Sequence, residues 1–171
     1  MPEPVTASAL ILGLVTLQRL AELVVARRNT RLLLQRGAFE VAPGHYPLIV
    51  AVHAGWLAAL WWLAPGKPIS WALIAVFAIL QAGRLWVLAT LGQRWTTRII
   101  ILPGAPLVTT GPFRLLRHPN YAVVVAEVAV LPLAFGLWQV ALLFSLLNAA
   151  VLAIRIRAEN AALSGGRCRP A

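Results

Sequence analysis

Long apolar segments joined by short loops are the feature that most limits how this chain can fold. Five segments qualify, and they cover residues 5–26, 47–64, 70–91, 121–135 and 137–156. A helix needs roughly 20 apolar residues to cross about 30 Å of hydrocarbon. In lipid, an open strand would leave its backbone groups unpaired, whereas a helix pairs them internally. The segments therefore predict an all-α integral membrane protein with about five transmembrane helices, the fourth being short.

The composition supports this interpretation and indicates a single domain. Of the 171 residues, 60% are hydrophobic and only 12% are charged, with a mean hydropathy of +0.80. A soluble domain of this length could not cover so much apolar surface. Because every segment is connected to the next by a short or medium loop, residues 1–171 are expected to form one domain. The last two segments predict a C-terminal helical hairpin that turns at Gly136.

Basic residues gather after alternate apolar segments, which predicts how the chain is oriented. The arginines on one side are Arg27, Arg28, Arg31, Arg36, Arg94, Arg98, Arg114, Arg117, Arg155, Arg157, Arg167 and Arg169, whereas Lys67 stands alone on the other. The positive-inside rule then places the N-terminus outside and the C-terminus in the cytoplasm. The net charge of +10 is therefore assigned to membrane lipid headgroups, and nucleic-acid binding is not expected.

The longest polar loop ends in a stretch rich in hydrogen-bonding and aromatic groups. Its β-branched run Thr97–Leu102 predicts a short extended segment. Further on, Pro119 suits the first turn of a helix, which places His118 at the helix mouth and Tyr121 in the first turn. These groups either form an interfacial belt or line a binding site where free helix N–H groups favour an acceptor.

A second polar group lies at the end of the last apolar segment. Asn148, Arg155 and Glu159 are spaced by seven and four residues, which places them on one helical face. One interpretation is an exposed Arg155–Glu159 salt bridge worth about 0.3–0.5 kcal/mol. However, Asn148 extends the stripe into the hydrocarbon zone, where a polar side chain needs a partner or a cavity.

Other polar residues inside the segments have structural and catalytic interpretations. Arg19 and Glu22 are one helical turn apart and are expected to pair, and Arg84 and Glu127 are candidates for an interhelical pair. Glu127 is also a candidate catalytic base. His53 is interpreted as a hydrogen-bonded histidine, since no second ligand is spaced to hold a metal with it. No metal site is predicted.

Three stretches in order resemble the isoprenylcysteine carboxyl methyltransferase family. They are Leu107–Phe113, Arg117–Tyr121 and, after the hairpin, the pair Arg155 and Glu159. Members of this family are integral membrane enzymes that use S-adenosylmethionine, and phospholipid N-methyltransferases share the C-terminal pattern. The resemblance covers about residues 104–163 and implies a cofactor pocket on the cytoplasmic side.

The resemblance also implies roles for individual residues. Those expected around the cofactor are Ala105, Pro106, Leu107, Val108, Phe113, His118, Pro119, Asn120, Tyr121 and Glu159. Arg155 would face the acceptor group of a lipophilic substrate. Two positions depart from the family pattern: Phe113 stands where many relatives have Tyr, and Asn160 stands where a second acid is usual.

The segments Arg94–Arg98 and Val123–Glu127 are most similar to a bacterial branch of the family. That branch O-methylates long-chain phenolic polyketides, the alkylresorcinols and alkylpyrones, which implies an enzyme of the bacterial cytoplasmic membrane. A neutral phenol needs a base, for which Glu127 and His118 are the candidates. Carboxyl methylation of isoprenylcysteine-like substrates, N-methylation of a phospholipid amine, and a non-enzymatic scaffold or subunit remain alternatives. The sequence predicts no oligomeric state.

Overall fold

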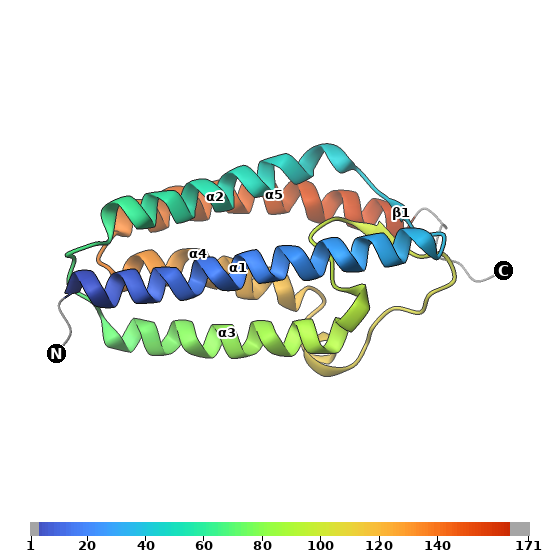
Figure 1. The fold of residues 1–171 in the computed structure, drawn as a ribbon. Coiled ribbons are helices and arrows are strands. Elements are labelled where there is room, and N and C mark those ends of the chain that lie inside the picture. Colours follow the sequence, from blue (N-terminus) through green and yellow to red (C-terminus); the bar gives the residue numbers. More distant parts are fainter. Residues whose placement is uncertain (1–3, 165–171) are drawn as a thin grey trace.

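The structure, a computed structural model, describes residues 4–164, and within them five α-helices form an elongated bundle (Figure 1). The helices are α1 (Pro4–Gln35), α2 (Tyr46–Leu63), α3 (Trp71–Leu91), α4 (Pro119–Ala134) and α5 (Trp138–Ser164). Four of them are long and apolar enough to cross a membrane, while α4 is a shorter apolar helix. The predicted all-α integral membrane fold is therefore confirmed.

Two helices run well past the apolar segments that predicted them. α1 continues beyond Ala26 to Gln35, and α5 continues beyond Ile156 to Ser164. Arginine is a good helix former although it is not apolar, so a basic run can prolong a helix that a hydropathy pattern would end. As a consequence, Glu159 lies within α5 together with Arg155, as the predicted helical face requires.

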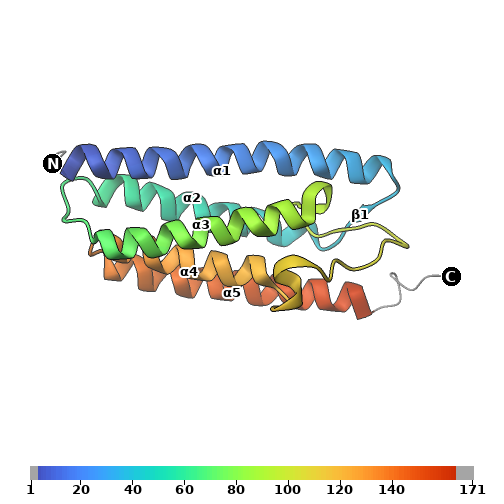
Figure 2. The ribbon, with the colours of Figure 1, turned by 90° about the horizontal axis from the view of Figure 1, so that it is seen from below.

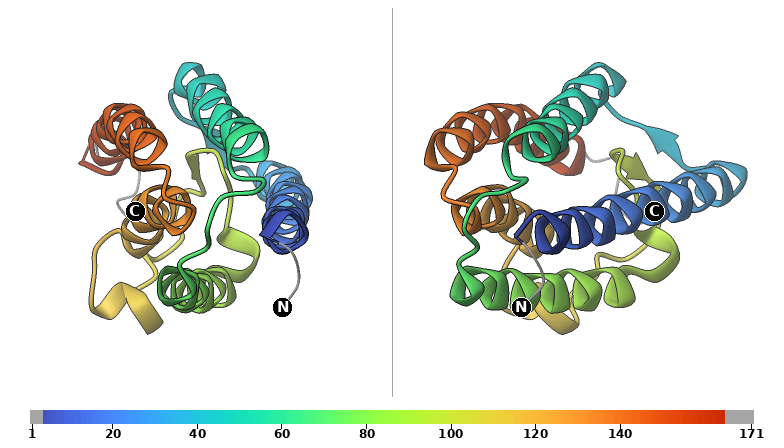
Figure 3. Two further views of the ribbon diagram at one scale, coloured as in Figure 1. Left: turned by 90° about the vertical axis from the view of Figure 1, so that its left-hand side faces the viewer. Right: turned by 60° about the vertical axis from the view of Figure 1, so that its left-hand side comes forward.

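The helices run alongside one another, with α4 packed between α3 and α5 and with α2 against α5. α1 and α5 lie on opposite sides of the bundle (Figures 2 and 3). Exposed leucines such as Leu10 and Leu14 on α1, and Leu142 and Leu146 on α5, provide the lipid-facing surface that such a protein requires.

The apolar core fills the half of the bundle nearest the α4–α5 turn. Its largest fully buried side chains include Trp56, Leu60, Leu131 and Phe135. The Trp56 indole Nε1 donates to the Val128 carbonyl oxygen at 3.1 Å and so ties α2 to α4. The predicted hairpin is confirmed, with Gly136 adopting a positive φ of 68° at the turn.

The connections at the other end of the bundle are joined by a small sheet. β1 (Phe39–Glu40) pairs antiparallel with β2 (Ile100–Ile101), so the predicted extended segment is confirmed. Three short 3₁₀ helices, at Pro43–His45, Gly92–Arg94 and Gly111–Arg114, complete these connections. The Asn29 amide Nδ2 donates to the Trp95 carbonyl oxygen at 2.9 Å, which holds the loop after α3 against the end of α1.

Candidate functional site

The two polar groups predicted at the ends of the hairpin meet in the structure. The Tyr121 hydroxyl, from the first turn of α4, donates to Glu159 Oε2 on α5 at 2.5 Å. Arg155 Nε in turn donates to the same hydroxyl oxygen at 2.9 Å. Because α4 and α5 are antiparallel neighbours, the start of one lies beside the end of the other. The direct Arg155–Glu159 ion pair of the first interpretation is absent among the described residues, since both side chains bind the Tyr121 hydroxyl instead.

Arg155 is buried, with 9% of its surface exposed, yet it forms no salt bridge with a carboxylate in the described part of the chain. Besides Tyr121, its partner is the Thr97 carbonyl oxygen, which accepts from Nη1 at 2.7 Å. The guanidinium also lies 5.5 Å from the centre of the Tyr121 ring. A buried cation with only neutral or shared partners is unfavourable. Such a group marks a place where a negatively charged ligand atom would be stabilised.

The mouth of α4 adds an aromatic surface and unpaired acceptors. The His118 ring stacks on the Tyr121 ring, with centroids 5.2 Å apart and planes inclined by 15°. Asn120 Oδ1 and Asn160 Oδ1 are both buried and have no hydrogen-bond partner. Buried acceptors are nearly always paired in native proteins. These two oxygens therefore suit a ligand that carries N–H or O–H donors.

The loop segment Ala105–Val108 is held by contacts separate from those of the Tyr121 and Glu159 cluster. Arg94 Nη1 donates to the Pro106 carbonyl oxygen at 2.5 Å, while Leu107 is 70% exposed. Gly111, with φ of 57°, brings the following turn against α3, where an added Cβ would lie 2.6 Å from Thr90 Oγ1. No hydrogen bond in residues 4–161 connects this loop to Tyr121 or Glu159. Phe113, in the short helix Gly111–Arg114, is half-buried.

Four charged residues, three of them buried and Arg19 partly buried, link α1, α3 and α4. Arg84 binds Glu22 through Nε and Nη2, both at 2.6 Å, and binds Glu127 Oε2 through Nη1 at 3.1 Å. Arg19 Nη2 lies 2.7 Å from Glu127 Oε2, and its Nη1 lies 3.3 Å from Glu22. The expected Arg19–Glu22 and Arg84–Glu127 pairs are thus confirmed, but as one network. Glu127 serves here as an interhelical partner, and its role as a base remains a prediction.

Replacing Glu127 with alanine is expected to lower the free energy of unfolding by about 3–5 kcal/mol, because both arginines would lose a buried carboxylate. Chemical denaturation of the detergent-purified protein measures this. Glu40→Ala is the matched control, since Glu40 pairs with a 41% exposed Arg98 side chain and such pairs contribute about 1 kcal/mol or less. Equal losses in the two variants would contradict the structural importance of the network.

A cavity of about 280 Å³ connects this network with the Tyr121 cluster. Its walls are mainly apolar, with Trp56, Leu57, Val124 and Leu152 among them. The polar residues that line it are Thr16, Arg19, Glu22, Tyr46, His53, Arg84, Thr96, Thr97, Asn120, Tyr121, Asn148 and Arg155. Glu127 is not among the lining residues. Thr97 and Tyr46 were not predicted here, because Thr97 reaches the cavity from the loop after α3 and Tyr46 from the start of α2, and no local pattern connects the two.

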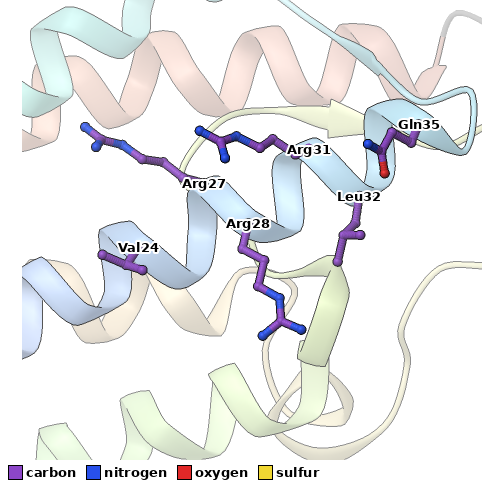
Figure 4. A pocket seen from close by; sticks show the side chains of 6 residues that line it. All are labelled: Val24, Arg27, Arg28, Arg31, Leu32 and Gln35. Atoms are coloured by element: carbon purple, nitrogen blue, oxygen red, sulfur yellow. The ribbon is translucent and has the colours of Figure 1, made fainter.

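A second hollow, of about 430 Å³, lies against the basic extension of α1. Arg27 and Arg31 point to one side of the helix and Arg28 to the other (Figure 4). All six lining residues belong to α1, so no other element closes this hollow. Its positive charge fits lipid headgroups at the membrane surface. Unlike the cavity between the helices, it has no acidic, histidine or tyrosine side chain among its lining residues.

Apolar helices of membrane-spanning length define an integral membrane protein. A partly buried cluster of Arg155, Tyr121 and Glu159, where the C-terminal hairpin meets the loops, gives it a polar site at one end. Comparison with known proteins specifies the class further. The model of the isoprenylcysteine carboxyl methyltransferase (ICMT) family matches residues 72–165, more than half of the chain. The chain belongs to this family and is therefore a membrane methyltransferase.

Two bacterial relatives match along almost the whole chain. The uncharacterized protein YpbQ of Bacillus subtilis is 39% identical over 159 residues, which are 90% of this chain and 95% of the relative. An uncharacterized protein of Haemophilus influenzae is 27% identical over 154 residues, 85% of this chain and 88% of the relative. No solved structure matches significantly. The resemblance predicted for residues 104–163 is thus confirmed at the level of the family and extends to α3.

Proposed function

We propose that the protein transfers a methyl group from S-adenosylmethionine to an oxygen atom of a lipophilic acceptor, a long-chain phenolic or pyrone lipid. The observation that carries this proposal is Arg155, a buried guanidinium without a carboxylate of its own in the described part of the chain. An oxygen nucleophile carries negative charge as it reacts, and Arg155 is placed to stabilise that charge.

The residues at the mouth of α4 fit the proposed cofactor. Its amino and hydroxyl groups are donors, which suit the unpaired Asn120 Oδ1 and Asn160 Oδ1 and the Glu159 carboxylate. Its adenine ring suits the stacked surface of His118 and Tyr121. By the family resemblance, the cofactor pocket would also be lined by Ala105–Val108, Phe113 and Pro119. When bound, S-adenosylmethionine supplies a methyl group activated by a positively charged sulfur.

The apolar walls of the cavity favour this chemistry. Methyl transfer consumes the charges of the cofactor and the acceptor oxygen together, so a site that excludes water favours the reaction. Much of the acceleration would come from holding the acceptor oxygen, methyl carbon and sulfur in line. The cavity of about 280 Å³ accommodates a ring-sized head group. The long chain of the acceptor would then lie among the helices, toward the lipid.

The charge around the cavity also ranks the alternatives. An isoprenylcysteine-like carboxylate is the second candidate, because it is also an oxygen anion that Arg155 would stabilise. A phospholipid amine becomes cationic on methylation and would be repelled by the same guanidinium. A non-enzymatic scaffold, whose polar groups would only pair helices, does not explain why Arg155 is buried without a salt bridge to a carboxylate in the described part of the chain.

The basic end of α1 supports a cytoplasmic position for the site. Asn29, between Arg28 and Arg31, is hydrogen-bonded to the loop after α3, at the end of the bundle that holds Tyr121 and Arg155. The positive-inside rule then gives a protein of the bacterial cytoplasmic membrane with its N-terminus outside. The cofactor would enter from the cytoplasm and the lipid from the bilayer.

Labelled S-adenosylmethionine, incubated with membranes that contain the protein, tests the acceptor class. Mild base releases methyl esters as methanol, whereas aryl methyl ethers survive and methylated amines separate as cations. We expect base-stable label in an uncharged lipid, identified by mass spectrometry. Base-labile or cationic product would overturn the choice of acceptor. No labelled lipid above the level of membranes without the protein would overturn the proposed function.

A further inference from the structure

His53, on α2, has one ring nitrogen engaged and one free. Nδ1 lies 2.9 Å from the Ile49 carbonyl oxygen, one turn earlier in the same helix. A carbonyl only accepts, so in the neutral ring the proton is on Nδ1, and Nε2 carries the lone pair. No hydrogen bond in the described part of the chain uses Nε2, and His53 lines the cavity. The cavity wall therefore holds a proton acceptor whose tautomer is set by the helix backbone.

Asn148, on α5, offers the complementary group. It is 2% exposed, it lines the same cavity, and its buried Nδ2 has no hydrogen-bond partner. A buried donor without an acceptor is unfavourable, so the site suits a ligand with a lone pair. A neutral hydroxyl satisfies both residues, because it donates to His53 Nε2 and accepts from Asn148 Nδ2. A carboxylate has no proton to donate, and an ammonium has no lone pair to accept with.

The two residues lie at a similar depth in the bundle. Asn148 is seven residues before Arg155, and His53 is seven residues after Tyr46, which is about 10 Å of helix in each case. α2 and α5 pack closely at this level, since a Cβ added to Gly55 would lie 3.4 Å from the Phe144 ring. Arg155 lines the same cavity as His53 and Asn148. The oxygen atom of an acceptor bound in the cavity can therefore be influenced by both His53 and Arg155.

From this arrangement we infer that His53 is the catalytic base and Asn148 the hydroxyl-binding residue, and that the acceptor is a neutral phenol or enol. The inference rests on the proposed function and narrows its substrate class. The acceptor hydroxyl gives its proton to His53 Nε2, and its oxygen forms a bond to the methyl carbon. The methyl–sulfur bond breaks, and its electron pair stays on the sulfur of the neutral thioether. The imidazolium then returns the proton to water.

His53→Asn separates a base from a packing residue, because the Asn amide can still donate to the Ile49 carbonyl but has no lone-pair nitrogen. With a long-chain alkylresorcinol, we expect turnover to fall on the order of a hundredfold, the usual contribution of a general base. With a long-chain nitrophenol, which is already ionised at the assay pH, we expect turnover close to that of the wild type. An equal fall with both phenols, or no fall with the alkylresorcinol, would overturn the assignment of His53.

Binding without cofactor gives a second readout. The affinity for the alkylresorcinol is expected to fall about tenfold in His53→Asn, as for one lost hydrogen bond. The affinity for its dimethyl ether, which has no proton to donate, should not change. Asn148→Ala should lower the affinity for both ligands, because hydroxyl and ether oxygens can both accept a hydrogen bond from Asn148 Nδ2. Calorimetric titration measures all four values. Equal loss for phenol and ether in His53→Asn would overturn the hydroxyl contact.

Failure of the proposed function and failure of this inference are distinguishable. If the wild type methylates neither phenol, both are overturned. If the wild type is active and His53→Asn is equally active with the alkylresorcinol, only the inference is overturned.

Discussion

Replacing Glu159 with alanine is expected to weaken binding of S-adenosylhomocysteine, the demethylated cofactor, on the order of a hundredfold. The carboxylate is the acceptor of the Tyr121 hydroxyl at 2.5 Å, and the Tyr121 ring is stacked on His118, where we place the adenine ring. Loss of hydrogen bonds to a charged group typically costs about 1.5–3 kcal/mol each. Calorimetric titration of the detergent-purified variant measures the change.

Arg157→Ala is the matched control, because Arg157 lies on the same last turns of α5 but is exposed. Its affinity should equal that of the wild type. Tyr121→Phe is a finer variant that keeps the ring stacked on His118 and removes only the hydroxyl. We expect about a tenfold loss of affinity for it. Wild-type affinity in Glu159→Ala would show that the cofactor binds elsewhere.

Replacing Arg155 with alanine is expected to lower kcat by about a hundredfold to a thousandfold, as for other groups that stabilise charge in a transition state. The affinity for S-adenosylhomocysteine should change much less, because the positive charge acts on the acceptor oxygen. The measurement is the rate of methyl transfer to a long-chain alkylresorcinol at saturating cofactor.

Arg155→Lys tests whether charge alone suffices. Lysine keeps the charge but lacks the planar fork that reaches Tyr121 and the Thr97 carbonyl together, so we expect an intermediate kcat. Arg98→Ala serves as a control, since its partly exposed guanidinium lies over Tyr46 and pairs with Glu40. An unchanged kcat in Arg155→Ala would show that the acceptor oxygen does not bind beside Arg155.

The helices could be predicted because lipid imposes a simple rule of length and apolarity. The same rule could not show where α1 ends, since the stretch from Arg27 to Gln35 is basic yet helical. The pairing of Phe39–Glu40 with Ile100–Ile101 could not be predicted either. It joins two loops far apart in sequence, and neither segment is long enough to signal a sheet alone.

The sequence could predict that Tyr121, Arg155 and Glu159 come together, but not which contacts they make. Helical spacing placed Arg155 and Glu159 on one face, and the hairpin brought Tyr121 to them. That the hydroxyl separates the two charges depends on the register between α4 and α5, which spacing alone does not determine. In the same way, Arg84 was expected to bind Glu127, whereas it also binds Glu22 because three helices meet there.

His53 shows how an interpretation can be confirmed and still be incomplete. The expected hydrogen bond exists, from Nδ1 to the Ile49 carbonyl oxygen. However, the sequence could not show that the residue lines a cavity together with Asn148 and Arg155, because the three come from two helices whose relative rotation is set by packing. The interpretation as a packed histidine therefore accounted for only one of its two nitrogens.

A crystal structure of the protein with S-adenosylhomocysteine bound would show directly whether the cofactor occupies the proposed site. We expect the ligand between the Ala105–Val108 loop and the cluster of Tyr121 and Glu159, with its donors facing Asn120 Oδ1 and Asn160 Oδ1. A ligand bound instead in the hollow formed by Arg27, Arg28 and Arg31, or at any other place away from Tyr121, would contradict it.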